Sequence, residues 1–212
     1  MAHYDLEEQE QIETLKTWWN MYGNLVTAMV VAASLAVIGW QGWNWYQRNQ
    51  TAQAAGVYAV LEQAVAARDA QKIKAAAGEL TEKYGRTSYA ALGALQAARQ
   101  SFDAGDAKTA IAQLTWAAEN GKDELKDMAR LRLAAVQLDE KAYDDALKNL
   151  DVAHAPAFAA RFQELKGDVL TAQGKKADAR VAYKAALDKA GDKQGPSREL
   201  LQQKLDSLGE AA

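Results

Sequence analysis

The longest hydrophobic run of the chain lies near its N-terminus, where LVTAMVVAASLAVIGWQGWNW occupies residues 25–45. No charged residue occurs between Lys16 and Arg48. At about 1.5 Å per helical residue, the block would cross the roughly 30 Å of a bilayer's hydrocarbon. A core helix of a soluble domain would carry a polar face, whereas only one threonine and one serine are polar before Trp40. The pattern predicts a transmembrane helix over residues 21–46.

Aromatic side chains mark both ends of this block. Five of the six tryptophans flank it, together with Tyr22 and Tyr46. Rings with an apolar body and a polar N–H or O–H suit the headgroup layer of a membrane. Core aromatics of a globular domain would not gather at both ends of one uncharged segment, so the aromatic positions favour a permanent anchor. The flanking tryptophans are Trp18, Trp19, Trp40, Trp43 and Trp45.

The segment before the block does not resemble a cleavable signal peptide. Such a peptide begins with a basic stretch and ends at a small-residue cleavage site. Here MAHYDLEEQEQIETLK has five acids and one lysine, and the apolar run ends in tryptophans, so residues 1–20 are predicted to stay as an acidic leader. The positive-inside rule compares Lys16 with Arg48, which is a tie, so charge alone leaves the orientation open.

Residues 47–212 show a different pattern. Alanine, leucine, charged and amide side chains dominate, and apolar residues recur at spacings of three and four, as in Leu131, Ala134 and Leu138. No stretch keeps the period-two alternation of a half-buried strand. This part of the chain is therefore predicted to be entirely helical.

A repeat is visible within this helical part. The segment KGDVLTAQGKKADARVAYKAAL, residues 166–187, places small residues at Gly167 and Ala179, a turn at Gly174 and an aromatic at Tyr183. This arrangement resembles the tetratricopeptide repeat, in which small residues let two antiparallel helices approach closely.

The same offsets recur in two earlier segments, residues 97–117 and 133–153. The small residue of the second helix falls at Ala110, Ala146 and Ala179, at separations of 36 and 33 residues, against a period of about 34 for tetratricopeptide repeats. Three units with consistent offsets predict an α-solenoid, because each unit needs a neighbour to bury its apolar face.

A degenerate first unit and a C-terminal capping helix are expected at the two ends of the solenoid. A first unit would place one helix at residues 57–67 and a second helix around Ile73, Ala76 and Leu80. At the other end, GPSRELLQQKLDSLG begins with a proline suited to a first helical turn and predicts a capping helix. Its apolar residues are Leu200, Leu201, Leu205 and Leu208. The predicted fold is all-α: an N-terminal transmembrane helix, a tetratricopeptide-like α-solenoid and a C-terminal capping helix.

Charge and composition narrow the function. Beyond the leader, 24 bases face 23 acids, which argues against a nucleic-acid-binding protein with its basic stripe. The chain has no cysteine, hence no disulfide or thiolate metal site, and its two histidines, His3 and His154, have no ligand or nucleophile nearby in sequence. We expect no catalytic, cofactor-binding or metal-binding residue, and no cofactor.

Solenoids bind other proteins. The first helix of each pair lines a concave surface that can hold a segment of a partner. Ten positions are assigned to this groove, and their apolar and basic side chains suit a peptide, although each is equally consistent with packing against the next repeat. The partner-binding groove candidates are Tyr58, Arg68, Leu95, Arg99, Phe102, Met128, Leu131, Arg161, Glu164 and Asp168.

The predicted transmembrane helix has a binding candidate of its own. Four small residues at spacings of four, four and three form a smooth stripe where another membrane helix could approach closely. Alanine is common in membrane spans, so the stripe is equally consistent with an ordinary composition. The membrane helix contact candidates are Ala28, Ala32, Ala36 and Gly39.

The whole layout resembles a known family. After the acidic leader comes an anchor ending in IGWQGWNWYQ, and the alanine-rich domain contains YAALGALQAAR, DELKDMARLRLAAVQL and ELKGDVLTAQGKKADARVAY. These segments are similar to those of YfgM-type ancillary subunits of the bacterial SecYEG translocon. The likeness covers nearly the whole chain and is far more specific than the repeat alone.

The resemblance implies a single-pass protein of the bacterial inner membrane, with residues 1–20 in the cytoplasm, residues 21–46 in the membrane and residues 47–212 in the periplasm. It implies association with the SecYEG translocon and with the membrane-anchored periplasmic chaperone PpiD, and the passage of exported client chains toward periplasmic chaperones. It also implies contact with a cytosolic regulator through the leader. It brings no catalytic residue.

An alternative function belongs to a different class. The protein could be a structural tether in another cell-envelope assembly, such as the cell-wall or division machinery, with the solenoid as a spacer. Basic and apolar side chains in an open groove favour the interaction module, whereas burial of those side chains between repeats would favour the tether.

Overall fold

The computed structural model describes residues 6–190 and 196–209, and helices are the only regular secondary structure in these two ranges. Residues 1–5, the start of the predicted leader, lie outside the described residues. The chain divides into two compact units, residues 1–49 and 50–212, which are described separately. The helices are α1 (Leu6–Ala66), α2 (Ala70–Lys83), α3 (Ser88–Asp103), α4 (Ala107–Asn120), α5 (Asp123–Asp139), α6 (Tyr143–Leu150), the 3-10 helix η1 (Pro156–Phe158), α7 (Ala159–Ala172), α8 (Lys176–Ala190) and α9 (Pro196–Ser207).

In the first unit, α1 carries the predicted transmembrane segment. Among the described residues, α1 alone is long and apolar enough to cross a membrane. Its large apolar side chains are exposed, Leu35, Ile38 and Trp40 by 64 to 67%, as expected where lipid rather than protein covers a helix. The hydroxyls of Thr27 and Ser34 each donate to a backbone carbonyl one turn earlier at 2.8 Å, so they need no partner from the membrane.

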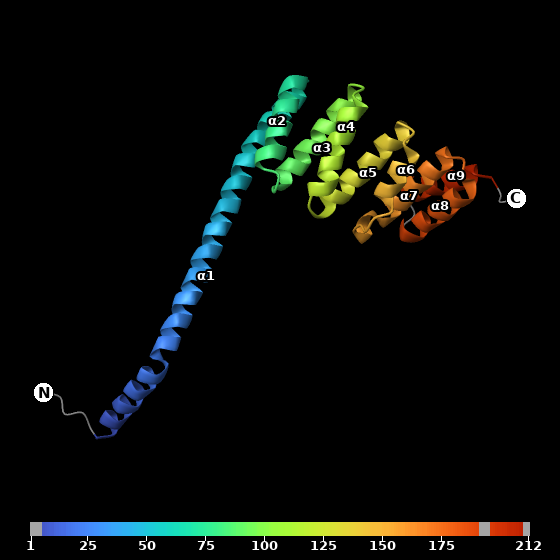
Figure 1. Ribbon diagram of the computed structural model, residues 1–212. Coiled ribbons are helices and arrows are strands. Elements are labelled where there is room, and N and C mark those ends of the chain that lie inside the picture. The colour runs from blue at the N-terminus through green and yellow to red at the C-terminus, as the bar shows by residue number, and fades with distance from the viewer. Residues whose placement is uncertain (1–5, 191–195, 210–212) are drawn as a thin grey trace. The chain divides into compact units, whose positions relative to one another are not determined.

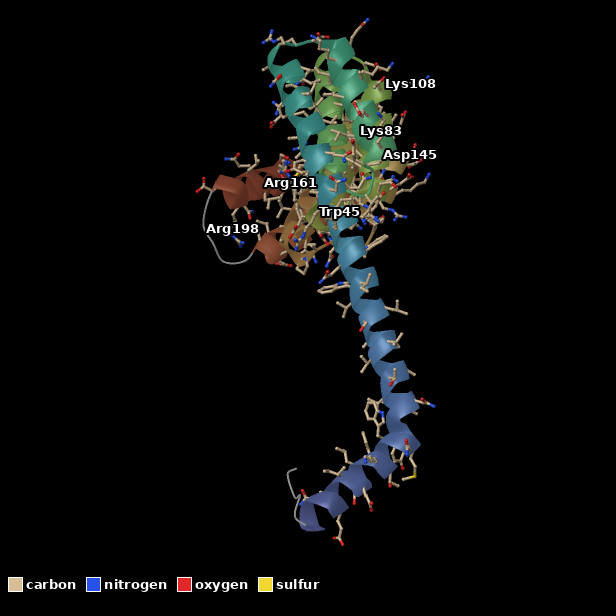
Figure 2. All side chains as sticks on the ribbon, turned by 90° about the vertical axis from the view of Figure 1, so that its left-hand side faces the viewer. Trp45, Lys83, Lys108, Asp145, Arg161 and Arg198 are labelled. Atoms are coloured by element: carbon tan, nitrogen blue, oxygen red, sulfur yellow. The ribbon has the colours of Figure 1, made fainter. Side chains whose placement is uncertain are left out.

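The aromatic residues lie in two groups along α1, as the sequence predicts. At one end of the apolar block the rings of Trp18 and Tyr22 have their centroids 5.9 Å apart, and at the other end those of Trp43 and Tyr46 are 6.2 Å apart. Trp45, which is labelled in Figure 2, belongs to the second group. These two groups are the aromatic belts expected at the two interfaces of a bilayer.

Helix α1 does not end with the apolar block, and the sequence analysis did not foresee this. The connecting residues 47–56 contain no proline, and their one glycine, Gly56, is tolerated inside a helix at a cost of about 1 kcal/mol. Helix α1 therefore continues to Ala66 and supplies the first helix of the first repeat. One unbroken helix thus contains both the anchor and the start of the solenoid.

In the second unit, helices pair in chain order: α1 with α2, α3 with α4, α5 with α6, and α7 with α8 (Figure 1). The buried apolar residues form four clusters that follow one another along the chain, each joining neighbouring pairs or the last pair to α9. This nearest-neighbour core is what a repeat solenoid requires. Large members of the four clusters, in chain order, are Leu80, Leu114, Phe162 and Tyr183.

The turn inside each helix pair has one conformation, repeated four times. A residue with positive φ ends the first helix: Arg68 (55°), Gly105 (82°), Lys141 (61°) and Gly174 (77°), at separations of 37, 36 and 33 residues. In each turn the following residue donates its N–H to the carbonyl five residues earlier, at 2.7–3.0 Å. This is the hydrogen bond of a Schellman motif. Arg68, predicted to lie on a groove helix, therefore lies in the first of these turns.

The small residues predicted for the helix contacts are buried. Ala110, Ala146 and Ala179 have no exposed surface. In the last pair, a β-carbon on Gly167 would lie 2.5 Å from two ring atoms of Tyr183, so only glycine lets α7 and α8 pack this closely around the tyrosine. The predicted tetratricopeptide-like packing is confirmed.

Helix α9 caps the solenoid as predicted. Leu201 and Leu208 are buried in the last core cluster, and Leu205 packs against it. The guanidinium of Arg198 also donates to the backbone carbonyl of Leu187 on α8, at 3.1 Å. Leu200, predicted to belong to the same apolar face, is 46% exposed and lies outside the cluster.

Candidate functional site

Three of the predicted groove residues, all on α7, lie in a network of charges that binds the capping helix. Lys204 of α9 donates to Glu164 Oε1 and to both carboxylate oxygens of Asp168, each at 2.8 Å. Glu164 Oε2 accepts from Arg161, labelled in Figure 2, at 2.5 Å. The hydroxyl of Tyr183 donates to Asp168 at 2.7 Å. The network thus joins α7, α8 and α9.

The electrostatics of this network stabilise its charged state. Burial alone would raise the pKa of Glu164, but hydrogen bonds from Lys204 and Arg161 hold that pKa below its usual value. Burial would lower the pKa of Lys204, but Asp168 and Glu164 raise it. Burial, together with the carboxylate of Asp168 beside the hydroxyl, raises the pKa of Tyr183. Because Glu164 is only 7% exposed, its carboxylate is committed to internal partners rather than to a ligand.

Other groove candidates also pack between repeats. Leu95 is 3% exposed and belongs to a core cluster, so it offers no surface to a partner. Met128 and Leu131 are partly buried against core clusters. The ring of Tyr58 lies with its centroid 5.5 Å from that of Tyr89 on α3. At these positions the structure follows the packing alternative.

Four groove candidates do present their side chains to solvent: Arg68 in the first turn, Arg161 on α7, and Arg99 and Phe102 on α3. Arg99 is exposed on α3 and forms an ion pair with Asp103 one turn later, at 3.8 Å. Phe102, on the same helix, is 37% exposed, which is unusual for a large aromatic outside a membrane segment. Arg99 and Phe102 therefore form an accessible pair on α3, and their role in binding remains a prediction.

A hollow of about 610 Å³, which the sequence analysis missed, lies where the turns of the first two helix pairs meet. Its lining includes Val65, Arg68, Lys74, Ser101 and Gln113, which come from α1 to α4 and the first turn. Its volume lies within the range of about 300–1,000 Å³ that ligand sites occupy. No sequence motif predicts this hollow, because its lining residues are spread over four helices.

The loop after α6 is fixed by polar contacts of its own. Asp127, buried on α5, accepts from the N–H of Ala155 at 2.8 Å, and Arg130 donates to the carbonyl of Ala153 at 3.1 Å. The ring of His154 packs edge-on against Phe162, 4.3 Å between centroids. Within residues 6–190 and 196–209, no three acidic or histidine side chains are grouped so as to hold a metal ion.

The small-residue stripe on the anchor is exposed along its whole length. No atom lies within 4 Å of a β-carbon built on Gly39, so a neighbouring helix would meet no obstacle there. The stripe, which is formed by Ala28, Ala32, Ala36 and Gly39, stays a predicted contact for another membrane helix.

Comparisons with known proteins agree with this architecture. Residues 16–210 match the family described as tetratricopeptide repeat-like domain. A protein of Neisseria gonorrhoeae named ancillary SecYEG translocon subunit is 36% identical, over 96% of this chain and 98% of its own length. Proteins of the same name from Escherichia coli and Haemophilus influenzae are 32% and 30% identical, over 95% and 97% of this chain and 96% and 99% of their own lengths. The chain therefore belongs to the family of ancillary SecYEG translocon subunits, whose sequence it matches from the membrane anchor to the capping helix.

Proposed function

We propose that this protein is a membrane-anchored interaction module that associates with the SecYEG translocon and links exported chains to the periplasmic chaperone network. The observation that carries the proposal is the joining of an exposed apolar span and a repeat solenoid in one helix, α1. The name shared by the full-length relatives supports the translocon as the partner. The protein acts by binding and has no chemical step.

The proposed topology is single-pass in the bacterial inner membrane. Residues 1–20 lie in the cytoplasm, residues 21–46 cross the membrane and residues 47–212 lie in the periplasm. Two observations support this topology. The anchor has no charged residue, and the solenoid buries its apolar side chains between its own helices, as a water-soluble domain does. The family resemblance supplies the direction that Lys16 and Arg48 leave undecided.

The proposed partners follow from the two exposed surfaces. The stripe from Ala28 to Gly39 would meet a transmembrane helix of the translocon. The face around Arg99 and Phe102 would meet a periplasmic chaperone, for which the resemblance names PpiD, or an exported chain. The leader would contact a cytosolic regulator. The tether alternative gains from the burial of Leu95 and Glu164, but the names of the relatives favour the translocon.

Photo-crosslinking in living cells tests the partners. A photoreactive amino acid replaces Ala32 in the anchor or Arg99 in the solenoid, and mass spectrometry identifies the adducts. We expect translocon subunits from Ala32 and a periplasmic chaperone or exported chain from Arg99. A probe at Lys184, exposed on α8, is the matched control for random capture. Adducts only with cell-wall or division proteins would replace the proposal with the tether function.

The topology can be tested by cysteine labelling. The chain has no cysteine of its own, so an introduced cysteine is its only thiol. Single cysteines at Gln11 in the leader and at Ser88 on α3 are each labelled in intact cells with a maleimide that crosses the outer membrane but not the inner one. We expect labelling at position 88 only, and at position 11 only after the inner membrane is opened. Labelling of position 11 in intact cells would reverse the orientation.

A further inference from the structure

The hollow between the first two helix pairs has only one of the ten groove candidates, Arg68, in its lining. It is formed by the ends of α1 and α3 and the beginnings of α2 and α4, where the turns inside the pairs lie. Ile73 and Ala97, both almost completely buried, contribute apolar walls. Gln100, Ser101 and Gln113 contribute amide and hydroxyl groups. The hollow thus combines apolar and uncharged polar surface with four charged side chains.

The next repeat shows why the hollow is there. Ser101 and Gln137 are at equivalent positions, because each carbonyl accepts the same turn hydrogen bond, from Asp106 and from Ala142. The two turns are 36 residues apart, so the residue equivalent to Gln113 is Asn149. The side-chain amide of Asn149 donates to the side-chain oxygen of Gln137 at 2.9 Å. In the earlier repeat the short serine cannot reach across, and the space stays open.

The unfilled space leaves one polar group without a partner. The side-chain oxygen of Gln113 is shielded from solvent and has no hydrogen-bond partner among the described residues. Rotating the amide by 180° would only exchange this acceptor for a donor. A buried polar group without a partner is unfavourable, so a ligand that pairs with it gains free energy on binding.

Charge around the hollow does not select a charged ligand. Arg68 and Lys74 contribute two positive charges, and Asp103 and Asp106 contribute two negative ones. Asp106 is held by its role as helix cap, where it accepts from the N–H of Thr109 at 3.0 Å. Hydrogen bonds from Thr109 lower the pKa of the Asp106 carboxyl, so the ring of charges stays balanced at neutral pH.

We propose that this hollow binds an extended, uncharged polypeptide segment. A main-chain amide of the segment pairs with the side chain of Gln113, and a small apolar side chain occupies the space between Ile73 and Ala97. A peptide group fits because it offers both a donor and an acceptor, as the side-chain amide does. The choice of a polypeptide as ligand rests on the proposed function, in which exported chains pass the solenoid.

The test uses the full chain in lipid nanodiscs and a fluorescein-labelled, end-blocked peptide of Gly, Ala, Val and Ser. Binding is measured by fluorescence anisotropy. S101Q places in the hollow the side chain that the next repeat has, and Q113L removes the unpartnered amide. Ser88→Gln, at an exposed position on the same helix as Ser101, is the matched control. Melting followed by circular dichroism checks that each variant is folded.

We expect the unchanged chain and S88Q to bind alike, and S101Q and Q113L to bind about tenfold more weakly or worse, as the loss of roughly 1.4 kcal/mol would give. Both weak variants should melt at the same or a higher temperature, because S101Q gives the buried amide of Gln113 a partner and Q113L removes that amide. Undiminished binding by S101Q, or no binding by the unchanged chain, would overturn the proposal. So would stronger binding of a peptide in which Glu or Lys replaces Ser.

Copurification with SecYEG separates this proposal from the proposed function. If S101Q loses the peptide but still copurifies with the translocon, both proposals are supported. If the unchanged chain binds the peptide through Ser101 but does not copurify with the translocon, the hollow stands and the translocon assignment falls.

Discussion

Lys204 Nζ on the capping helix lies 2.8 Å from Glu164 Oε1 on α7, across 40 residues of sequence. The same ammonium group bonds both oxygens of Asp168. A single side chain of α9 therefore bridges two carboxylates on α7, and Arg161 supplies the second positive charge through Glu164. Glu164 and Asp168, which were predicted to line a binding groove, therefore hold the capping helix in place.

Replacing Lys204 with methionine should loosen that attachment. The carboxylates of Glu164 and Asp168 would lose their shared cation, which we expect to cost roughly 2 kcal/mol, below the 3–5 typical of deeply buried pairs because Lys204 is partly exposed. Hydrogen exchange in α9 should be faster in this variant than in the unchanged chain, whereas exchange in α3 should stay the same. Lys184→Met, an exposed lysine on α8, should leave exchange unchanged. Equal exchange of α9 in both variants would contradict the structural role.

The same network predicts how stability depends on pH. The pKa of Glu164 is lower in the folded chain, so its contribution is present above the unfolded value of about 4.3 and is lost as the pH falls through the folded pKa. The pKa of Lys204 is higher in the folded chain, so its contribution is present below about 10.4 and is lost as the pH rises through the folded pKa. Cap opening should be slowest between these limits, after correction for the intrinsic pH dependence of exchange, and K204M should flatten the profile. A profile unchanged by K204M would contradict the assignment.

Gly167 provides a test of the helix packing. A methyl group there would meet the ring of Tyr183, and overpacking of this kind costs about 1–3 kcal/mol, which outweighs the roughly 1 kcal/mol of helix propensity gained. Gly167→Ala should therefore lower the melting temperature. Gly78→Ala on α2, where nothing lies within 4 Å, should raise it.

A double-mutant cycle identifies the cause. In the Y183L background the ring is absent, so G167A should cost less than it does in the unchanged chain. The third helix pair already has alanine and leucine at these two places, because Ala134 and Leu150 are equivalent to Gly167 and Tyr183. A cost for G167A that is independent of residue 183 would show that the glycine is needed for another reason.

The fold could be predicted from the sequence because its signals are local and repeated. Small residues such as Ala110 and Ala146 recur at a nearly fixed separation, and each occurrence supports the others. The continuity of α1 was missed because the linker, although proline-free and rich in helix formers, has no stripe of large apolar residues that continues the anchor into the first repeat. Residues 47–56 are mostly alanine, glutamine and other polar residues, and their favourable helix propensity does not by itself fix where a helix ends.

The candidate site was harder to predict, because solvent access depends on which helix covers which. The register placed Leu95, Arg99 and Glu164 on the first helices of their pairs, as found, but could not tell that Leu95 is covered and that Glu164 pairs with Lys204 forty residues later. The hollow was invisible because it depends on a difference between repeats, serine at 101 against glutamine at 137.

Lys141 allows a test of the repeated turn. It has a φ of 61°, a conformation that costs a non-glycine residue roughly 1–2 kcal/mol, whereas two of the four turns have glycine there. Lys141→Gly should stabilise the solenoid by about 0.5–1 kcal/mol, after the extra entropy of glycine in the unfolded chain is subtracted. Urea unfolding measures the change. Lys184→Gly, inside α8, should lose about 1 kcal/mol, and a loss in both variants would contradict the turn geometry.

The tryptophans test whether α1 spans a bilayer. Trp116 is the one tryptophan away from the apolar block, so Trp116→Phe leaves the five belt tryptophans as the only source of indole fluorescence. In vesicles, lipids brominated near the headgroup should quench this fluorescence more than lipids brominated at the chain ends, because belt rings lie at the two interfaces. This result alone does not distinguish a spanning helix from one lying along the surface, because the belt rings would lie near the headgroups in both cases. The deciding probe is therefore a second variant in which Val31, midway between the two belts, is replaced by tryptophan in a W116F background with the belt tryptophans changed to phenylalanine. A spanning helix predicts that chain-end bromines quench this single indole most strongly, and quenching mainly by headgroup bromines would show that α1 lies along the surface.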